Sequence, residues 1–361
     1  MNASFGKKFC AVLATGRVAN LPTVWSNVIV AFYLAASLDL TGYGSFIADS
    51  GNNFYQWLMF FGCIATSMLY VGGCMLGDYR DIRFDTENRP GRPLVTGLLS
   101  PGFVALGAIT LLVLGLLFGG LSSLVALLIA YEIPLSAITS APADQLLMLL
   151  QITPLFLLGT LVLAIVLYAL FHKKSRSLAL LNMASCRALL VVFAGALSIP
   201  PDTPIHLHWL CSPLMIIAFS VGIYTLLLAS VAATESNQNK IKFSRALKAG
   251  MFLLPLLAVA CLAVTDAPFF PLFDRSTFPS DTISAPTLRA YFIGTVLIYG
   301  SWMIYSFSAL PKDKPAFVSR ALAGFCLLDA CFAATFSVTI PLVCFILFGL
   351  ALLLQKIAPA T

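Results

Sequence analysis

The chain has 361 residues, of which 60% are hydrophobic and only 10% are charged. A soluble domain carries about 25% charged residues, so this composition excludes an ordinary soluble protein and predicts a chain that crosses a membrane several times. A net charge of +6 would suggest nucleic acid in a soluble protein. In a membrane protein it indicates positively charged cytoplasmic loops, and we expect no nucleic-acid partner.

Apolar segments long enough to cross a bilayer recur along the whole chain. The ten segments cover residues 19–38, 55–76, 101–119, 154–171, 178–198, 212–234, 246–265, 289–309, 317–334 and 337–355. A further apolar run at 121–138 is interrupted by Glu132 and Pro134. It would be a re-entrant piece, an interfacial piece or an extension of the span before it. We expect residues 1–361 to form one all-α polytopic membrane domain.

Lysines and arginines gather in alternate connections between the segments. They are Lys7, Lys8, Arg17, Arg80, Arg83, Arg89, Arg92, Lys173, Lys174, Arg176, Lys240, Lys242, Arg245, Lys248, Lys312, Lys314, Arg320 and Lys356. The opposite connections are acidic. This asymmetry predicts that both termini and the connections after 55–76, 154–171 and 212–234 face the cytoplasm. We expect an integral protein of a bacterial inner membrane.

Three aspartates follow the second apolar segment, at Asp78, Asp81 and Asp85. On a helix this spacing places all three on one face, where like charges repel unless a cation lies among them. Carboxylate oxygens select Mg²⁺ or Ca²⁺, and protein-bound Mg²⁺ usually completes its shell with water and substrate phosphates. The pattern therefore indicates a site that holds a diphosphate through Mg²⁺ at the membrane boundary. A solvated acidic turn is the plainer interpretation.

Arginines interleave with these acids and favour the first interpretation. They are Arg80, Arg83, Arg89 and Arg92. The guanidinium fork matches phosphate geometry with two parallel hydrogen bonds. The stretch 88–97 that follows contains two prolines and two glycines, which predict a compact, stiff turn.

Polar residues inside the apolar segments are functional candidates, because an ionisable group in a span is costly unless paired or wet. Arg187 either reaches back to the cytoplasmic interface or lines a cavity and binds an anion. Asp329 would be a packing or cavity residue with no assigned role. Glu235, with two asparagines nearby, forms a weak second oxygen-donor group after segment 212–234, or an ordinary polar helix end.

The run Gly77-Asp78-x-x-Asp81-x-x-x-Asp85, followed by Arg89-Pro90-x-Arg92-Pro93-Leu94-x-x-Gly97, resembles the first aspartate-rich motif of the UbiA superfamily of intramembrane prenyltransferases. The opening Arg17-Val18-x-Asn20-Leu21-Pro22-Thr23-Val24-Trp25-x-Asn27 resembles the first helix of that family. The run Asn182-Met183-x-x-Cys186-Arg187 is similar to the EboC-like branch.

The resemblance implies nine helices around a central cavity that opens to the cytoplasm and sideways to lipid. The ten segments are one too many, and the surplus would be 317–334 or a broken final helix. The implied activity is Mg²⁺-dependent transfer of a prenyl group from an isoprenyl diphosphate to a lipophilic acceptor. Asp78, Asp81 and Asp85 would hold Mg²⁺. The residues implied to bind substrate are Arg187, Lys174, Arg89, Arg92, Asn27, Asn182 and Glu235.

Two departures from the family pattern stand out. Gly77 occupies the position of the usual asparagine, which removes one oxygen ligand. The second aspartate-rich motif is reduced to Glu235 with Asn237 and Asn239. A non-enzymatic isoprenoid carrier or scaffold is therefore an alternative. A CDP-alcohol phosphotransferase would need D-G-x-x-A-R, which is missing here, and a secondary transporter would show an internal repeat, which we do not find.

Overall fold

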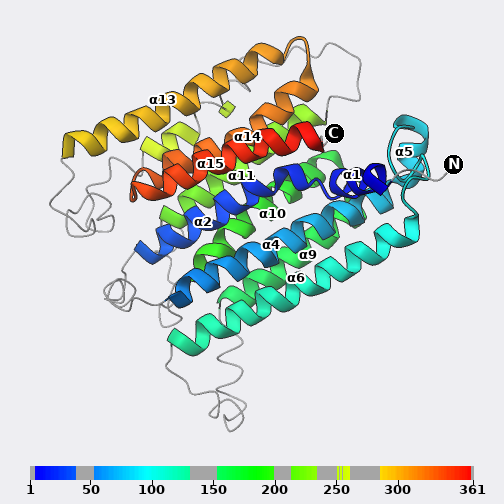
Figure 1. The fold of residues 1–361 in the computed structure, drawn as a ribbon, viewed down its shortest axis with the longest axis horizontal. Coiled ribbons are helices and arrows are strands. Elements are labelled where there is room, and N and C mark those ends of the chain that lie inside the picture. Colours follow the sequence, from blue (N-terminus) through cyan, green and yellow to red (C-terminus); the bar gives the residue numbers. More distant parts are fainter. Residues whose placement is uncertain are drawn as a thin grey trace, which may run out of the picture.

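The computed structural model describes residues 5–37, 53–130, 153–198, 213–233, 250–251, 253, 255–260 and 285–358. Within these ranges the regular structure is helical throughout, and the long helices run side by side in a bundle (Figure 1). The elements are α1 (Phe5–Thr15), η1 (Val18–Asn20), α2 (Leu21–Ser37), α4 (Asn53–Arg80), α5 (Ile82–Asn88), α6 (Pro101–Ala130), α9 (Thr153–Phe171), α10 (Arg176–Ala196), α11 (Pro213–Ala232), α13 (Ala285–Ala309), α14 (Lys314–Ala333) and α15 (Thr339–Ile357).

The described residues contain nine helices that are long and apolar enough to cross a membrane. The expected all-α polytopic membrane protein is thus confirmed. These nine helices match nine of the ten expected segments, and the tenth, 246–265, lies largely outside the described residues. Segments 317–334 and 337–355 belong to separate helices, α14 and α15, so a broken final helix is not the source of the surplus. Helix α6 continues to Ala130, so the first part of the 121–138 run extends the preceding span.

Helices α2 and α14 occupy the centre of the bundle. Their most apolar windows are 78% and 72% buried, whereas those of α6, α13 and α15 are each 22% buried. Helix α2 contacts α4, α10, α11, α14 and α15. The outer helices can leave leucine and isoleucine uncovered because lipid tails are as apolar as these side chains. The buried polar residues of these two helices, Thr23, Ser26, Asn27 and Asp329, are consequently shielded from both water and lipid.

Glycine allows α4 and α6 to approach closely. A Cβ atom on Gly115 of α6 would lie 2.8 Å from the Leu69 side chain and 3.0 Å from the Ala65 carbonyl oxygen of α4. On the α4 side, a Cβ on Gly72 would meet Leu112 at 3.0 Å. Small residues at such crossings strengthen helix packing in membranes. The contact fixes the direction of α4, whose last turn carries Asp78.

Both ends of the described chain lie at the same end of the bundle as α5 (Figure 1). The α9–α10 turn is also there, because His172 in that turn contacts Asp81 beside α5. The cation-rich turns that the structure describes therefore share one end of the bundle, while the turn with Lys240 and Lys242 and most of the acidic connections fall outside the described residues. The cytoplasmic assignment of that end stays a prediction.

Candidate functional site

Asp78 lies in the last turn of α4 and is almost completely buried. Its two carboxylate oxygens face two arginines from different parts of the chain. Arg17 Nη2 lies 3.6 Å from Asp78 Oδ1, and Arg92 Nη1 lies 3.5 Å from Asp78 Oδ2. The two arginines balance the negative charge of the carboxylate. They also interact favourably with the partial negative charge at the C-terminus of α4. The arrangement places two forked cations at one end of the bundle.

Arg17 reaches this position through an uncommon backbone conformation. It is the one non-glycine residue with positive φ in the described part of the chain, with φ 49° and ψ 41°. Helix α1 has ended at Thr15, and the left-handed residue turns the chain into η1. For a residue with a Cβ atom this conformation costs about 1–2 kcal/mol. The fold tolerates this cost at the point where the guanidinium meets Asp78.

A tight turn after α5 carries Arg92. The Leu99 amide donates to the Pro93 carbonyl at 3.2 Å, and Gly97 adopts φ +71°, a conformation that glycine adopts without penalty. Leu94 and Leu99 are buried in a small apolar cluster with α1, α4 and α6 residues. The sequence predicted a compact turn here, and its apolar anchors explain why Arg92 is directed back to α4.

The three aspartates do not share one uninterrupted helix. Helix α4 ends at Arg80, Asp81 has φ −87° and ψ −3°, and α5 begins at Ile82. The amides of Asp81 and Asp85 still donate four residues back, at 3.0 and 2.8 Å, so the helical spacing largely survives. Asp85 is 5% exposed, and its side chain makes no hydrogen bond or ion pair within the described residues. It is a buried carboxylate that interacts electrostatically with Asp78 and has no cation of its own there.

Asp81 turns instead to the α9–α10 turn. His172 Nε2 and Lys173 Nζ each lie 3.0 Å from Asp81 Oδ1. His172 Nδ1 lies 3.0 Å from the Tyr168 carbonyl oxygen. Both ring nitrogens of His172 therefore face acceptors, an arrangement that only the doubly protonated ring satisfies fully. The Asp81 hydrogen bond raises the pKa of His172 above its ordinary value. Burial acts to raise the pKa of Asp81, but the bonds from His172 and Lys173 outweigh it and lower that pKa.

The His172–Asp81 pair should make stability depend on pH. A histidine whose pKa is raised on folding contributes stability that is fully present below its unfolded pKa of about 6.5 and is lost as pH rises through the folded value. At the acid end, the Asp81 contribution is lost as pH falls through its lowered pKa. We expect His172→Gln to destabilise the protein by up to about 1 kcal/mol near pH 6 and by less at pH 9. Thermal unfolding in metal-free detergent measures this, and a pH-independent difference would contradict it.

Several residues predicted to bind substrate lie elsewhere. Lys174 is exposed and its ammonium lies over the Phe171 ring, so its neighbour Lys173 is the lysine that reaches Asp81. Arg89 is exposed at the end of α5, with no side-chain partner in the described part of the chain. Asn182 donates to the Ala164 carbonyl at 3.0 Å and joins α10 to α9. Glu235 lies outside the described residues.

A second polar group lies deeper in the bundle, between α2 and α14. Asp329 is fully buried; it accepts from Ser26 Oγ at 2.5 Å and from Asn27 Nδ2 at 2.9 and 2.7 Å. Arg187 donates to Thr23 Oγ1, and its guanidinium stacks over the Phe325 ring at 4.8 Å. Arg187 is thus held inside the bundle and does not extend to the interface. Thr23, Ser26 and Asn27 lie on one face of α2, because their spacing follows the helical repeat.

A polar column connects the two groups. Asn20 Nδ2 donates to the Tyr70 hydroxyl at 3.0 Å, and Tyr70 interacts electrostatically with both Arg17 and Arg187. Three buried polar atoms near this column have no hydrogen-bond partner in the described residues: Asn20 Oδ1, Asn27 Oδ1 and Arg17 Nε. Buried polar atoms are normally paired, so these atoms mark places where water or a ligand would bind.

The aspartates supply hard oxygen donors of the kind that Mg²⁺ prefers. Within the described residues, no three His, Cys, Asp or Glu side chains lie close enough together to form a metal-binding group. Asp78 and Asp85 fit a cation best, because Asp85 is buried without a countercharge there. Asp81 would have to share its oxygens with His172 and Lys173. The three-aspartate magnesium site therefore stays a prediction.

Sequence reasoning missed His172 and Lys173 as members of the charged cluster, and left Arg17 out of the candidate site. A signal existed for each. Arg17 opens the stretch that resembles the family's first helix, and the 172–177 connection was expected on the same membrane face as the aspartates. Only the packing of α9 against α4 shows which of the adjacent side chains reaches Asp81.

The fold and this cluster define an all-helical integral membrane protein with a charged site at one end of its bundle. No family model matches the chain. Over 84 residues it is 31% identical to digeranylgeranylglyceryl phosphate synthase of Hyperthermus butylicus, a match that covers 23% of this chain and only 28% of that protein. A solved structure of digeranylgeranylglyceryl phosphate synthase aligns with 91% of this chain and 98% of its own, at 15% identity and a TM-score of 0.49. Such a likeness is too distant to carry an argument.

Proposed function

We propose that the protein is an intramembrane prenyltransferase of the UbiA superfamily, which transfers a prenyl group from an isoprenyl diphosphate to a lipophilic acceptor. The observation that carries the proposal is the buried carboxylate of Asp78 between the forked cations Arg17 and Arg92, with a second buried carboxylate, Asp85, seven residues further along the chain. The local similarity to a digeranylgeranylglyceryl phosphate synthase supports the superfamily. It does not support the EboC-like branch in particular, which stays a prediction.

The cations of the Asp78 cluster can stabilise a diphosphate leaving group. Within the part of the chain that the structure describes, Arg17 and Arg92 contact one carboxylate, that of Asp78, at 3.5–3.6 Å, so their remaining donors are available there for phosphate oxygens. Lys173, at the other side of Asp81, adds a third cation. Fixed positive groups placed where negative charge develops lower the barrier to bond breaking. Mg²⁺, when bound by Asp78 and Asp85, would neutralise further charge on the departing diphosphate.

The bundle suits the prenyl chain. The helices around the charged end expose apolar side chains, and an isoprenoid tail can lie among them with its diphosphate at the cluster. An apolar surrounding also keeps water from an allylic cation, which would otherwise be hydrolysed. Arg187 and Asn27 would lie deeper along the polar column, beyond Tyr70. The acceptor, the cytoplasmic orientation and a contribution from Glu235 belong to the proposal as well.

Binding of farnesyl and geranylgeranyl diphosphate to detergent-purified protein, with and without Mg²⁺, tests the proposal. The informative variant is Asp85→Asn, which removes a buried charge while keeping the shape of the side chain. Glu87→Gln is the matched control, because Glu87 is an exposed carboxylate on the same short helix. We expect Asp85→Asn to weaken Mg²⁺-dependent binding at least tenfold, since even outer partners of a metal site are worth about 10–100-fold.

The control should bind like the wild type. Diphosphate binding that does not depend on Mg²⁺ and is unchanged by Asp85→Asn would contradict the proposed chemistry. It would favour the alternative of a non-enzymatic carrier or scaffold. Asp81→Ala adds a second check, because it removes the carboxylate that holds His172 and Lys173. The test needs no knowledge of the acceptor.

Gly77 offers a gain-of-function variant. A Cβ atom on Gly77 meets nothing within 4 Å, so a side chain can leave the backbone at this position without displacing a neighbour. Gly77→Asn would restore the oxygen ligand that the family motif carries one residue before Asp78. We expect Mg²⁺ to support diphosphate binding at a concentration about tenfold lower than in the wild type, given an additional oxygen ligand. A Mg²⁺ titration measures this, with Gly77→Ala as the control that adds bulk without a ligand. An equal gain in both variants would contradict it.

A further inference from the structure

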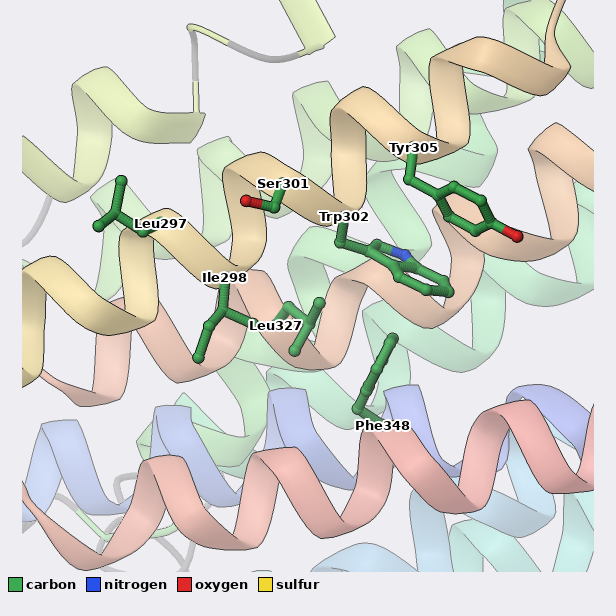
Figure 2. A pocket seen from close by; sticks show the side chains of 7 residues that line it. All are labelled: Leu297, Ile298, Ser301, Trp302, Tyr305, Leu327 and Phe348. Carbon is green, nitrogen blue, oxygen red and sulfur yellow. The ribbon is translucent and has the colours of Figure 1, made fainter.

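An open apolar groove of about 470 Å³ runs along α13 where it meets α14 and α15. Figure 2 shows the side chains of Leu297, Ile298 and Trp302 on α13, Leu327 on α14 and Phe348 on α15 around it. Trp302 and Phe348 meet edge to face, with ring centroids 4.8 Å apart. The groove lies away from the Asp78 cluster, because α13 and α4 are on opposite sides of the bundle (Figure 1).

An arginine stands at one end of this groove. The Arg320 guanidinium lies 4.1 Å above the ring of Tyr305, which also lines the groove, and its Nη1 is 3.5 Å from the Tyr305 carbonyl oxygen. Trp302 Nε1 donates to the Arg320 carbonyl at 2.9 Å, which holds this part of α14 against α13. Within the described residues Arg320 forms no ion pair, so most of its donors are uncommitted there.

The groove lies in the membrane-spanning part of α13. That span covers Ala290–Ala309, and Tyr305 is four residues, roughly 6 Å, from its charged end. From Tyr305 to Leu297 the groove follows the helix for roughly 12 Å toward the bilayer centre. Tryptophan and tyrosine near the end of a span mark the headgroup level. The arginine therefore lies near the depth of lipid phosphates and the groove at the depth of acyl chains.

We propose that this groove binds an anionic phospholipid, with one acyl chain along α13 and the headgroup phosphate on Arg320. An arginine within a span is costly unless it meets an anion, and its fork matches a phosphate. The apolar lining gives the chain a surface that water does not reach. The exposed Lys312 at the α13–α14 turn adds positive charge nearby, which favours an anionic headgroup over a zwitterionic one.

Native mass spectrometry tests the proposal, using protein exchanged into detergent that contains phosphatidylglycerol or phosphatidylcholine with identical acyl chains. Arg320→Gln removes the proposed phosphate ligand. Arg176→Gln is the matched control, since Arg176 is an exposed arginine at the start of α10, far from the groove in sequence. Ser301→Trp fills the groove from its exposed wall and leaves every charge in place.

We expect wild type and Arg176→Gln to retain one phosphatidylglycerol about tenfold more tightly than phosphatidylcholine, the size of effect of a hydrogen bond to a charged group. Arg320→Gln should lose this preference, and Ser301→Trp should release the lipid. Equal retention of both lipids by the wild type, or an unchanged preference in Arg320→Gln, would overturn the proposal. If Arg320→Gln does not fold, the Ser301→Trp variant is the test. Phosphatidylglycerol retained by Ser301→Trp as tightly as by the wild type would also overturn the proposal.

Discussion

Replacing Asn27 by leucine is expected to lower the free energy of unfolding by about 3–5 kcal/mol, because the substitution leaves a buried carboxylate without its main partner. Asp329 is completely buried between α2 and α14, and both of its oxygens accept from the Asn27 amide. Among the described residues, Ser26 would remain as its one hydrogen-bond donor. The buried carboxylate would keep only the Ser26 hydrogen bond and the more distant charge of Arg187, which do not replace two hydrogen bonds from the Asn27 amide.

The double variant Asn27→Leu/Asp329→Leu should recover most of this loss. Replacing both members of a buried polar pair by apolar side chains is often neutral or stabilising, whereas removing one member is not. Asn182→Leu is the control, because the Asn182 amide makes one bond to a helix carbonyl and should be worth about 1 kcal/mol. Denaturant unfolding in detergent, followed by tryptophan fluorescence, gives all four values. A loss in Asn27→Leu no larger than in Asn182→Leu would contradict the expectation.

The sequence predicted the spans well because the thickness of a bilayer sets the length of an apolar segment. Boundaries near the charged end differ by a few residues, since α4 continues beyond its apolar part to Arg80 and so carries Asp78 within the helix. Helix α2, from Leu21 to Ser37, falls within the first expected segment, 19–38, whereas α1 before it was not predicted as a separate helix. These features depend on residues close together in the chain.

The partners of the polar residues could not be predicted in the same way. Asp329 and Asn27 are 302 residues apart, and their contact exists only because α2 and α14 both occupy the centre of the bundle. The same holds for His172 and Asp81, which are 91 residues apart. Asn182 was expected in the cavity, but the rotation of α10 directs its amide onto α9. Helix spacing indicates which residues share a face, yet the neighbour of that face depends on packing.

Arg17 combines a strained left-handed backbone with a cation that faces Asp78. Two substitutions at this position should separate the energetic cost of the backbone conformation from the contribution of the charge. Arg17→Ala keeps a Cβ atom at φ 49° and removes the cation that faces Asp78. Arg17→Gly removes the same cation, but glycine adopts the left-handed conformation freely. We therefore expect Arg17→Gly to unfold in detergent with a free energy about 1 kcal/mol higher than Arg17→Ala.

Both variants should bind farnesyl diphosphate at least tenfold more weakly than the wild type, because each lacks a cation that can hold phosphate oxygens and each leaves Asp78 with Arg92 alone. Arg83→Ala is the control, since Arg83 is an exposed arginine of α5 that makes no ion pair within the described residues. Equal stability of the two Arg17 variants would show that the backbone is not strained there. Unchanged binding in both would show that Arg17 only balances the charge of Asp78. We expect Arg17→Gly to be more stable than Arg17→Ala and both variants to bind diphosphate more weakly than the wild type. This combination would show that Arg17 belongs to the diphosphate site and that the fold holds it in a conformation its backbone disfavours.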